Sequence, residues 1–220
     1  MVCLLCGNNS DSNESLLAIL LFFNQESYLC LACQQKFHQL KGELCMHCCK
    51  VSSQSPCQDC QKWQLDYQHK VDHLALYKYN QAMKDYFKAY KFQGDFLLRK
   101  AFIKPIRKAL KPYQNTYHII PVPLDEVRLN SRGFNQVVAL LEEAKVPYHQ
   151  VFGKHPSQRQ SAKSRQERLM TENPFFLKAK PPKQILLVDD VYTTGATIFQ
   201  LTNLLKQAGV TTIKSFSLAR

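Results

Sequence analysis

The sequence predicts an α/β protein in which a mainly parallel sheet is flanked by helices and preceded by a small cysteine-rich domain. Apolar strand patterns alternate with helical patterns between residues 67 and 220, and this alternation is typical of a parallel sheet. All nine cysteines lie between residues 3 and 60. The charge divides in the same way: residues 1–66 carry 4 basic and 6 acidic side chains, residues 67–220 carry 25 and 11, and the net charge is +12. We therefore predict a cysteine-rich domain at 1–66 and an α/β domain at 67–220.

The composition excludes several classes of protein. Apolar residues make up 45% of the 220 and there are 7 glycines, so the chain is neither collagen-like, nor a disordered tail, nor a coiled coil. The longest apolar run, residues 16–23, is far shorter than the roughly 18 residues that a membrane span needs. No basic segment precedes this run, so we expect no signal peptide, no membrane insertion and a cytoplasmic protein.

The cysteines form four Cys-x-x-Cys pairs, and this spacing predicts metal binding. Two intervening residues let both sulfurs of a pair reach one ion, so two pairs complete a tetrahedral site and four pairs complete two. In a reducing compartment such clustering favours structural Zn²⁺ over disulfides. The spacing leaves open whether neighbouring or alternating pairs share an ion, whether Cys49 is a spare thiol or a ligand in a shifted register, and whether His47 replaces a thiol. The predicted zinc ligands are Cys3, Cys6, Cys30, Cys33, Cys45, Cys48, Cys57 and Cys60.

Hydrophobic periodicity and helix-ending residues predict the elements in the first part of the α/β domain. Residues 61–68 are expected to be a linker, with Trp63 as a plug between the two domains. Pro105 is expected to interrupt one helix, and Gly133 to precede the next. The predicted strands are 71–79, 117–122 and 146–152, and the predicted helices are 82–92, 96–110 and 134–144.

A polar segment follows. Residues 153–183 lack periodicity, and residues 145–183 carry 9 Lys or Arg against 2 acids, so we predict a flexible basic loop at 153–183. A strand at 185–188, a helix at 196–207 and a strand at 211–218 complete the predicted sheet.

Residues 185–197 are a buried strand, two acids and a small-residue loop that opens a helix. In open α/β sheets, ligands bind at the carboxyl ends of the strands. The backbone N–H groups of residues 193–197 at a helix N-terminus suit a phosphate group, and Gly195 permits its close approach. The carboxylates of Asp189 and Asp190 suit sugar hydroxyls or a bound cation. The segment therefore predicts a sugar-phosphate site.

This segment resembles the 5-phosphoribosyl 1-pyrophosphate (PRPP) motif of type I phosphoribosyltransferases. The resemblance implies a phosphoribosyltransferase-like domain that binds PRPP with Mg²⁺. It implies that Asp189 and Asp190 are the catalytic acids and contact the ribose hydroxyls. The PRPP-binding residues that it implies are Thr193, Thr194, Gly195, Ala196 and Thr197, which hold the 5′-phosphate, and Pro121, Val122 and Pro123, which form the pyrophosphate loop.

Three further segments narrow the resemblance: residues 121–124, the run Arg132-Gly-Phe-Asn-Gln136, and residues 160–165 followed by Arg168. With the cysteine pairs, they are similar to the ComF competence family over essentially the whole chain. The resemblance implies a role in natural transformation, handling single-stranded DNA that enters the cytoplasm. The implied partners are the helicase-like ATPase ComFA and other DNA-processing competence proteins, which would recruit the chain to the inner face of the membrane.

Three functions fit these residues. As an adaptor, the chain would bind single-stranded DNA through basic side chains interleaved with aromatic ones, and a partner would supply the motor because the sequence has no GxxxxGK[ST] motif. As an enzyme, it would be a Mg²⁺-dependent phosphoribosyltransferase that uses PRPP on an unidentified acceptor. A structural dimer would bind neither DNA nor PRPP. The predicted DNA-binding residues are Arg132, Arg159, Lys163, Arg165 and Arg168, and a second basic face comprises Lys84, Lys88, Lys91, Arg99, Lys100, Lys104, Arg107, Lys108 and Lys111.

Overall fold

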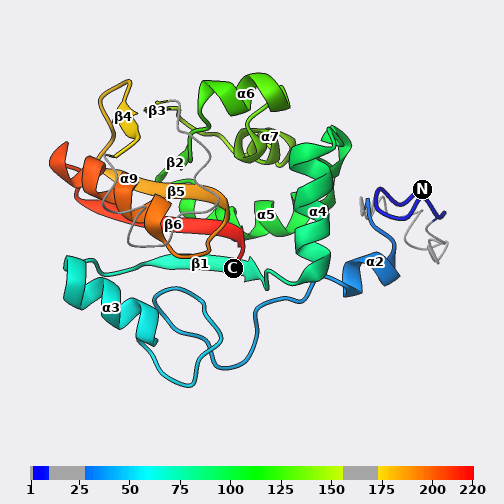
Figure 1. The fold of residues 1–220 in the computed structure, drawn as a ribbon, viewed down its shortest axis with the longest axis horizontal. Helices are drawn as coiled ribbons and strands as arrows, with labels where there is room; N and C mark the ends of the chain where they lie inside the picture. Colours follow the sequence, from blue (N-terminus) through cyan, green and yellow to red (C-terminus); the bar gives the residue numbers. More distant parts are fainter. Residues whose placement is uncertain (1, 10–27, 156–172) are drawn as a thin grey trace.

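The computed structural model describes residues 2–9, 28–155 and 173–220, and a four-stranded sheet lies at its centre (Figure 1). The strand order is β1-β6-β5-β2, and each strand runs parallel to its neighbours. The predicted mainly parallel sheet is confirmed. Its strands are β1 (His73–Tyr77), β2 (His118–Pro121), β5 (Gln184–Val191) and β6 (Thr212–Ala219).

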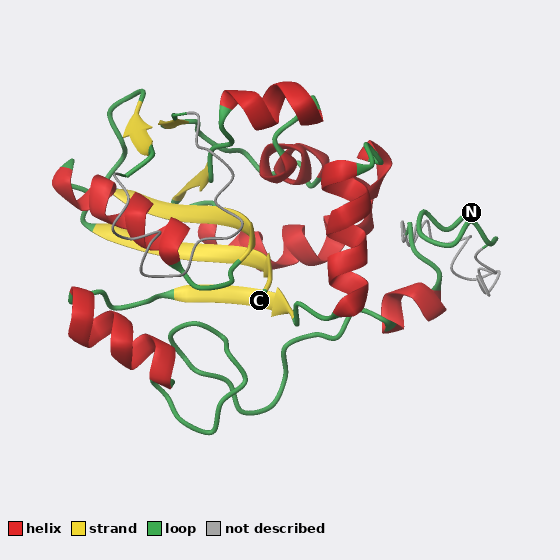
Figure 2. Cartoon of the chain, in the orientation of Figure 1, coloured by secondary structure: helices red, strands yellow, loops and turns green. Residues whose placement is uncertain are grey.

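Helices cover both faces of this sheet, as predicted (Figure 2). Side chains alternate between the two faces along a strand, so β5 contributes to two separate cores. Leu186 and Val188 join one core, and Ile185 and Leu187 join the other. The first core is formed with α4 (Gln81–Phe92), the 3₁₀ helix η1 (Phe96–Phe102), α5 (Ile103–Leu110) and α7 (Gln136–Glu143), and the second with α3 (Gln58–Tyr67) and α9 (Ala196–Gln207).

The predicted helix at 96–110 is two elements, η1 and α5, and the break lies at Ile103 instead of Pro105. Pro105 is the third residue of α5, where a backbone N–H has no partner inside the helix, so proline is tolerated there. A second 3₁₀ helix, η2 (Lys111–Tyr113), follows directly.

One short helix, α6 (Glu126–Arg132), was not expected from the sequence. The Asp125 side chain caps it by accepting a hydrogen bond from the Arg128 N–H (3.0 Å). Gly133 ends it in the left-handed conformation, with φ at 81°. Seven residues carry too little periodicity to reveal such a helix, so its caps are the signal that sequence analysis could have used.

The predicted strand at 146–152 is wrong over most of its length. Pro147 has no backbone N–H to donate to a strand ladder, and residues 146–151 form no strand. Instead, β3 (Phe152–Lys154) pairs with β4 (Phe175–Leu177) in a separate antiparallel sheet. The predicted loop at 153–183 therefore contains two strand-forming stretches, 153–154 and 175–177, and residues 156–172 lie outside the described residues.

The two cysteine-rich segments join different cores, the first the core that contains α4 and the second the core that contains α9. The first, with α2 (Leu31–Gln35), packs beside η1, where the rings of Phe37 and Phe102 meet edge to face at 5.0 Å. The second ends in α3, which lies next to β1 in Figure 1. The predicted linker at 61–68 is helical for most of its length, because α3 continues through it with Trp63 buried against α9. None of the helices in the described ranges has the length and apolarity that a membrane span needs.

Candidate functional site

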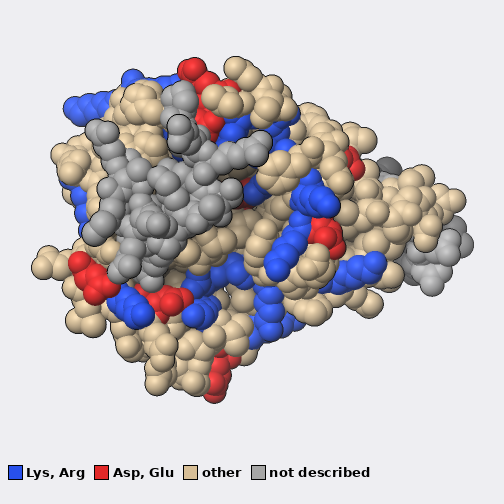
Figure 3. Space-filling view, in the orientation of Figure 1, with Lys and Arg blue, Asp and Glu red and all other residues tan. Residues whose placement is uncertain are grey.

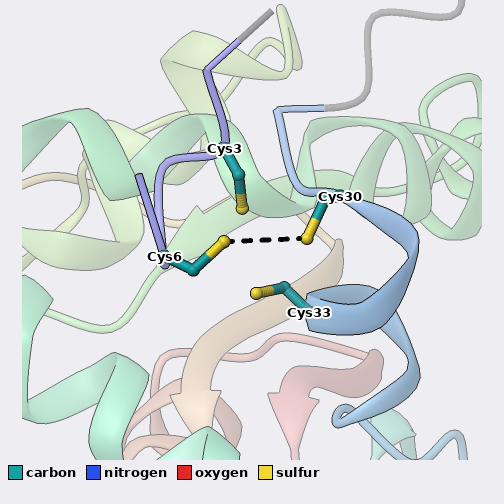
Figure 4. A group of neighbouring side chains, drawn as sticks. All are labelled: Cys3, Cys6, Cys30 and Cys33. Atoms are coloured by element: carbon teal, nitrogen blue, oxygen red, sulfur yellow. Dashed lines mark hydrogen bonds between the residues drawn. The ribbon is translucent and has the colours of Figure 1, made fainter. Parts of the chain in front are cut away.

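The eight predicted zinc ligands form two groups of four, and Figure 4 shows the group that contains Cys3. In each group the sulfurs all lie within 4.8 Å of one another. The Cys6 and Cys30 sulfurs are 3.8 Å apart in the first group, and those of Cys48 and Cys57 are 3.6 Å apart in the second. A tetrahedral Zn²⁺ with bonds of about 2.3 Å places its sulfur ligands about 3.8 Å apart, so both groups fit zinc. The groups are Cys3, Cys6, Cys30 and Cys33, here the first cluster, and Cys45, Cys48, Cys57 and Cys60, here the second cluster.

This grouping answers the questions that spacing left open. Neighbouring pairs share a site, and pairs do not alternate. The Cys49 thiol lies outside the second cluster and donates to the His73 carbonyl (3.3 Å). The His47 ring nitrogen Nδ1 lies 3.2 Å from the Val71 carbonyl oxygen. Both side chains therefore contact backbone carbonyl oxygens of neighbouring segments, and neither belongs to a group of four cysteines.

Each cluster contains a thiol with a lowered pKa. Burial opposes ionisation of Cys3, but nearby backbone N–H groups outweigh it and lower the pKa of this thiol to about 6. A hydrogen bond from Cys60 and the charge of Arg220 lower the pKa of Cys48 to about 5. Thiolates are the form that binds zinc, and four thiolates leave no open position for water. The donor sets therefore suit structural zinc.

The predicted phosphate-binding residues line one cavity of about 270 Å³ at the carboxyl end of β5. The loop between β5 and α9 forms one wall, with Gly195 as the residue before α9 in a left-handed conformation (φ 85°). Asp189 lies in the same cavity. The lining residues are Arg128, Lys154, Asp189, Val191, Tyr192, Thr193, Thr194, Gly195, Ala196, Thr197, Ile198 and Gln200.

The two motif acids are neighbours on β5 but have different partners, because successive side chains on a strand start from opposite faces of the sheet. Asp189 faces the cavity. Asp190 is buried, and its carboxylate forms an ion pair with Lys91 of α4. Burial would raise the pKa of Asp190, but the charge of Lys91 outweighs it and lowers this pKa. Burial and the neighbouring charge of Asp190 raise the pKa of Asp189 well above its usual range.

The predicted pyrophosphate loop, residues 121–123, contributes none of the residues that line the cavity in the described part of the chain. It is nevertheless tied to the site. The Val122 N–H donates to the Val188 carbonyl of β5 (2.8 Å). The Asn135 side chain donates to the Val122 carbonyl (3.1 Å) and also caps α7 by accepting from the Val137 N–H (2.9 Å). Asn135 thus links this loop to the helix layer.

Two cations in the cavity, Arg128 and Lys154, were not predicted as site residues. Both lie near the buried carboxylate of Asp125, whose Oδ2 is 3.5 Å from Arg128 Nε and 3.9 Å from Lys154 Nζ. Burial and the charge of Arg128 lower the pKa of Lys154. Asp125 was recognisable as a helix cap three residues before Arg128, whereas Lys154 carried no local signal. Together they give the cavity a positive side.

Of the predicted DNA-binding residues, the structure describes Arg132. Its guanidinium donates to the Lys91 carbonyl (3.0 Å) and to the Gln136 side chain, and it lies 5.5 Å from the ring centroid of Phe92. Arg132 therefore joins α6 to α4 while remaining half-buried. The other predicted DNA contacts lie outside the described residues: Arg159, Lys163, Arg165 and Arg168.

Comparison with known proteins identifies relatives along the whole chain, although no protein-family model matches. Competence protein ComFC of Streptococcus pneumoniae (strain ATCC BAA-255 / R6) is 45% identical over 222 residues, which cover 100% of both proteins. The chain belongs to the ComFC family of competence proteins. Competence protein ComFC of Bacillus subtilis (strain 168) is 31% identical over 229 residues, covering 100% of this chain and 95% of that protein. Competence protein F of Haemophilus influenzae (strain ATCC 51907 / DSM 11121 / KW20 / Rd) is 27% identical over 233 residues, covering 90% and 98%.

Two crystal structures of a hypoxanthine phosphoribosyltransferase from Staphylococcus aureus overlap about half of this ComFC-family chain. The tetragonal form has a TM-score of 0.34 and 14% identity, and covers 54% of this chain and 63% of that one. The orthorhombic form has a TM-score of 0.32 and 16% identity, with coverages of 52% and 57%.

The ligand groups predict two zinc ions per chain, measured by elemental analysis of the purified protein. The double variant Cys57→Ser/Cys60→Ser should retain one ion, because it removes half of the second cluster. Cys49→Ser should retain both, because that thiol bonds a backbone carbonyl instead. Loss of an ion in Cys49→Ser would contradict the assigned ligands.

The Lys91–Asp190 pair predicts a pH-dependent stability. We expect Lys91→Met to lower the free energy of unfolding at neutral pH by about 3–5 kcal/mol, because it leaves a buried carboxylate without its partner. Lys91 lowers the pKa of Asp190, so its contribution is present above the unfolded-state pKa of about 3.9 and is lost as the pH falls through the folded-state pKa. Urea unfolding should therefore show the difference from wild type shrinking between neutral pH and about pH 3.

The matched control is Lys88→Met, on an exposed position of the same helix, which should change stability by less than about 0.5 kcal/mol. A loss in Lys91→Met that is equal at every pH would show that packing, and not charge, accounts for the effect.

Proposed function

We propose that this ComFC-family protein acts in natural transformation by handling incoming single-stranded DNA in the cytoplasm, with the helicase-like ATPase ComFA and other DNA-processing competence proteins as partners. We further propose that the cavity at the end of β5 binds PRPP with Mg²⁺. The sequence has no GxxxxGK[ST] motif, so ATP-driven movement of the strand belongs to ComFA in this proposal. The partners would bring the chain to the inner face of the membrane.

The observation that carries the sugar-phosphate assignment is the shared lining of the cavity. Backbone N–H groups at the start of α9, the hydroxyls of Thr193 and Thr197, and two cations surround a space of about 270 Å³. A helix N-terminus with cations beside it favours a phosphate group. Asp189 adds a carboxylate for a sugar hydroxyl or for Mg²⁺. This combination supports a phosphorylated sugar better than a phosphate alone.

Isothermal titration calorimetry with PRPP and Mg²⁺ tests this assignment. We expect wild-type protein to bind, and Lys154→Met to weaken binding at least tenfold, since hydrogen bonds to charged groups contribute about 1.5–3 kcal/mol. Lys178→Met is the matched control, because Lys178 is exposed after β4 and does not line the cavity. Absence of binding to wild type would contradict the proposal, and release of pyrophosphate would assign the alternative transferase activity.

A surface near the end of α4 supports the DNA assignment. The Phe92 ring is 76% exposed and has the Arg132 guanidinium beside it. Phe96 is 40% exposed, with the Arg99 guanidinium 3.7 Å from its ring centroid. Lys and Arg side chains also gather along α4 in the space-filling view (Figure 3). Exposed rings for base stacking beside cations for phosphates are what a single strand needs. Arg159, Lys163, Arg165 and Arg168, which the proposal also assigns to DNA binding, lie outside the described residues.

Fluorescence anisotropy with a labelled oligo-dT strand tests this surface at two salt concentrations. Phe92→Ala should weaken binding about fivefold or more, because one base stacked on an aromatic ring contributes about 1–3 kcal/mol. Affinity of the wild type should fall steeply with salt. Leu65→Ala is the control, since Leu65 is 80% exposed on α3. Equal affinities of Phe92→Ala and wild type would exclude this surface as the DNA site.

A further inference from the structure

The second cluster is joined to the phosphate-binding loop by one helix. Cys57 and Cys60 lie at the start of α3, and Trp63 follows three residues after Cys60 on the same side of the helix. The Trp63 side chain is 1% exposed, and its indole N–H donates to the Thr194 carbonyl (3.1 Å). Thr194 lines the phosphate cavity. A metal-binding residue and a ligand-binding loop are therefore connected through a single side chain.

Arg220 makes a second connection between the same two parts. Its guanidinium Nη1 donates to the Thr193 carbonyl (3.4 Å), and its Nη2 lies 3.8 Å from the Asp59 carboxylate. Asp59 lies between Cys57, the residue before α3, and Cys60 in its first turn. The guanidinium also lies 4.7 Å from the ring centroid of Tyr192. Two successive carbonyls of the loop thus accept hydrogen bonds, one from a side chain of α3 and the other from a side chain that contacts Asp59 of α3.

The loop packs closely against these side chains. Gly195 has φ at 85°, and a Cβ there would collide with the Tyr192 hydroxyl and lie 3.3 Å from Trp63 Nε1. The Trp63 ring itself packs on Phe199 of α9 at 4.8 Å. Trp63 therefore contacts both the loop and the helix whose first turn faces the cavity. A displacement of α3 would therefore move Trp63 away from both the loop and α9.

The first cluster lacks such a connection among the described contacts. Cys3 and Cys33 belong to the core on the α4 face, whereas the second cluster belongs to the core that contains Trp63. The chain therefore contains an internal control. Both clusters consist of four cysteines, but among the described residues only the second is connected to the loop, through α3.

We infer that zinc in the second cluster positions the phosphate-binding loop, with Trp63 and Arg220 as the positioning residues. The segment from Cys45 to Cys60 is too short to form a core of its own, so the metal holds the start of α3 in place. With that end anchored, the indole N–H and the guanidinium hold the loop carbonyls, and the loop N–H groups are arranged before a phosphate arrives. Prearrangement of this kind increases affinity because less ordering is needed on binding. The identity of the ligand rests on the proposed function, but the arrangement of the loop does not.

The first experiment compares two metal-site variants with wild type. Cys57→Ser/Cys60→Ser empties the second cluster, and Cys30→Ser/Cys33→Ser empties the first. Hydrogen exchange measured by mass spectrometry follows the peptide covering residues 192–199, and calorimetry follows binding of PRPP with Mg²⁺. Trp63 is the one tryptophan in the sequence, so its emission reports on this contact directly. Emptying the second cluster should speed exchange of the loop at least tenfold, shift the Trp63 emission to longer wavelength and weaken PRPP binding at least tenfold. Emptying the first cluster should leave the exchange rate and the PRPP affinity within twofold of wild type and the Trp63 emission wavelength unchanged.

A second variant separates positioning from folding. Trp63→Phe keeps a ring in the core but removes the indole N–H, so both zinc ions should remain by elemental analysis. We expect PRPP binding to weaken about three- to tenfold, as loss of one hydrogen bond predicts, and loop exchange to rise. Tyr67→Phe is the control, because Tyr67 lies on α3 with its ring 5.2 Å from that of Trp63. Unchanged loop exchange and unchanged affinity in Trp63→Phe would overturn the inference.

The outcomes also separate this inference from the proposed function. If wild type binds no PRPP but the loop still exchanges faster when the second cluster is emptied, the proposed ligand is wrong and the positioning role stands. If wild type binds PRPP and neither affinity nor loop exchange depends on the second cluster, the ligand is right and the positioning role is overturned.

Discussion

Strand β5 is the constraint on which the candidate site depends. It is buried on both faces and hydrogen-bonded to a parallel strand on each side, so its residues have one register. Successive side chains on such a strand point to opposite faces. The neighbouring acids Asp189 and Asp190 therefore have different surroundings: the first lines the cavity, and the second is neutralised by Lys91 from the opposite helix layer. A motif that looks like a pair of equivalent acids contains one acid in the cavity and one acid in the core.

The two cysteine clusters connect the N-terminal segments to the two cores beside this sheet. Short cysteine-rich segments cannot bury enough apolar surface to fold alone, and zinc held by four thiolates would supply the missing stability. The two clusters belong to different cores, and the second one places Trp63 beside the loop after β5. The second cysteine cluster and the loop after β5 are thus parts of one packed layer.

Periodic elements could be predicted closely, and elements that depend on partners could not. The helix at 196–207 has the bounds that its pattern and the following glycine predict. The strand at 146–152 failed because Pro147 interrupts the ladder, although the segment is apolar. β3 and β4 are three residues each, too short for a pattern, and they form only because residues 152–154 and 175–177 meet across a long separation in sequence. A hydrophobic pattern predicts an element that can pack on any apolar surface. It does not predict a short strand that forms only by pairing with one particular distant segment.

The sequence by itself determined which eight cysteines cluster, the parallel sheet and the loop that lines the cavity, because each depends on spacings of a few residues. Only the tertiary structure decided which cysteine pairs come together, which acid lines the cavity and which cations line it. It also brought Trp63 to Thr194, 131 positions away along the chain. Contacts of that kind depend on how the helices pack on the sheet, and no local spacing encodes them.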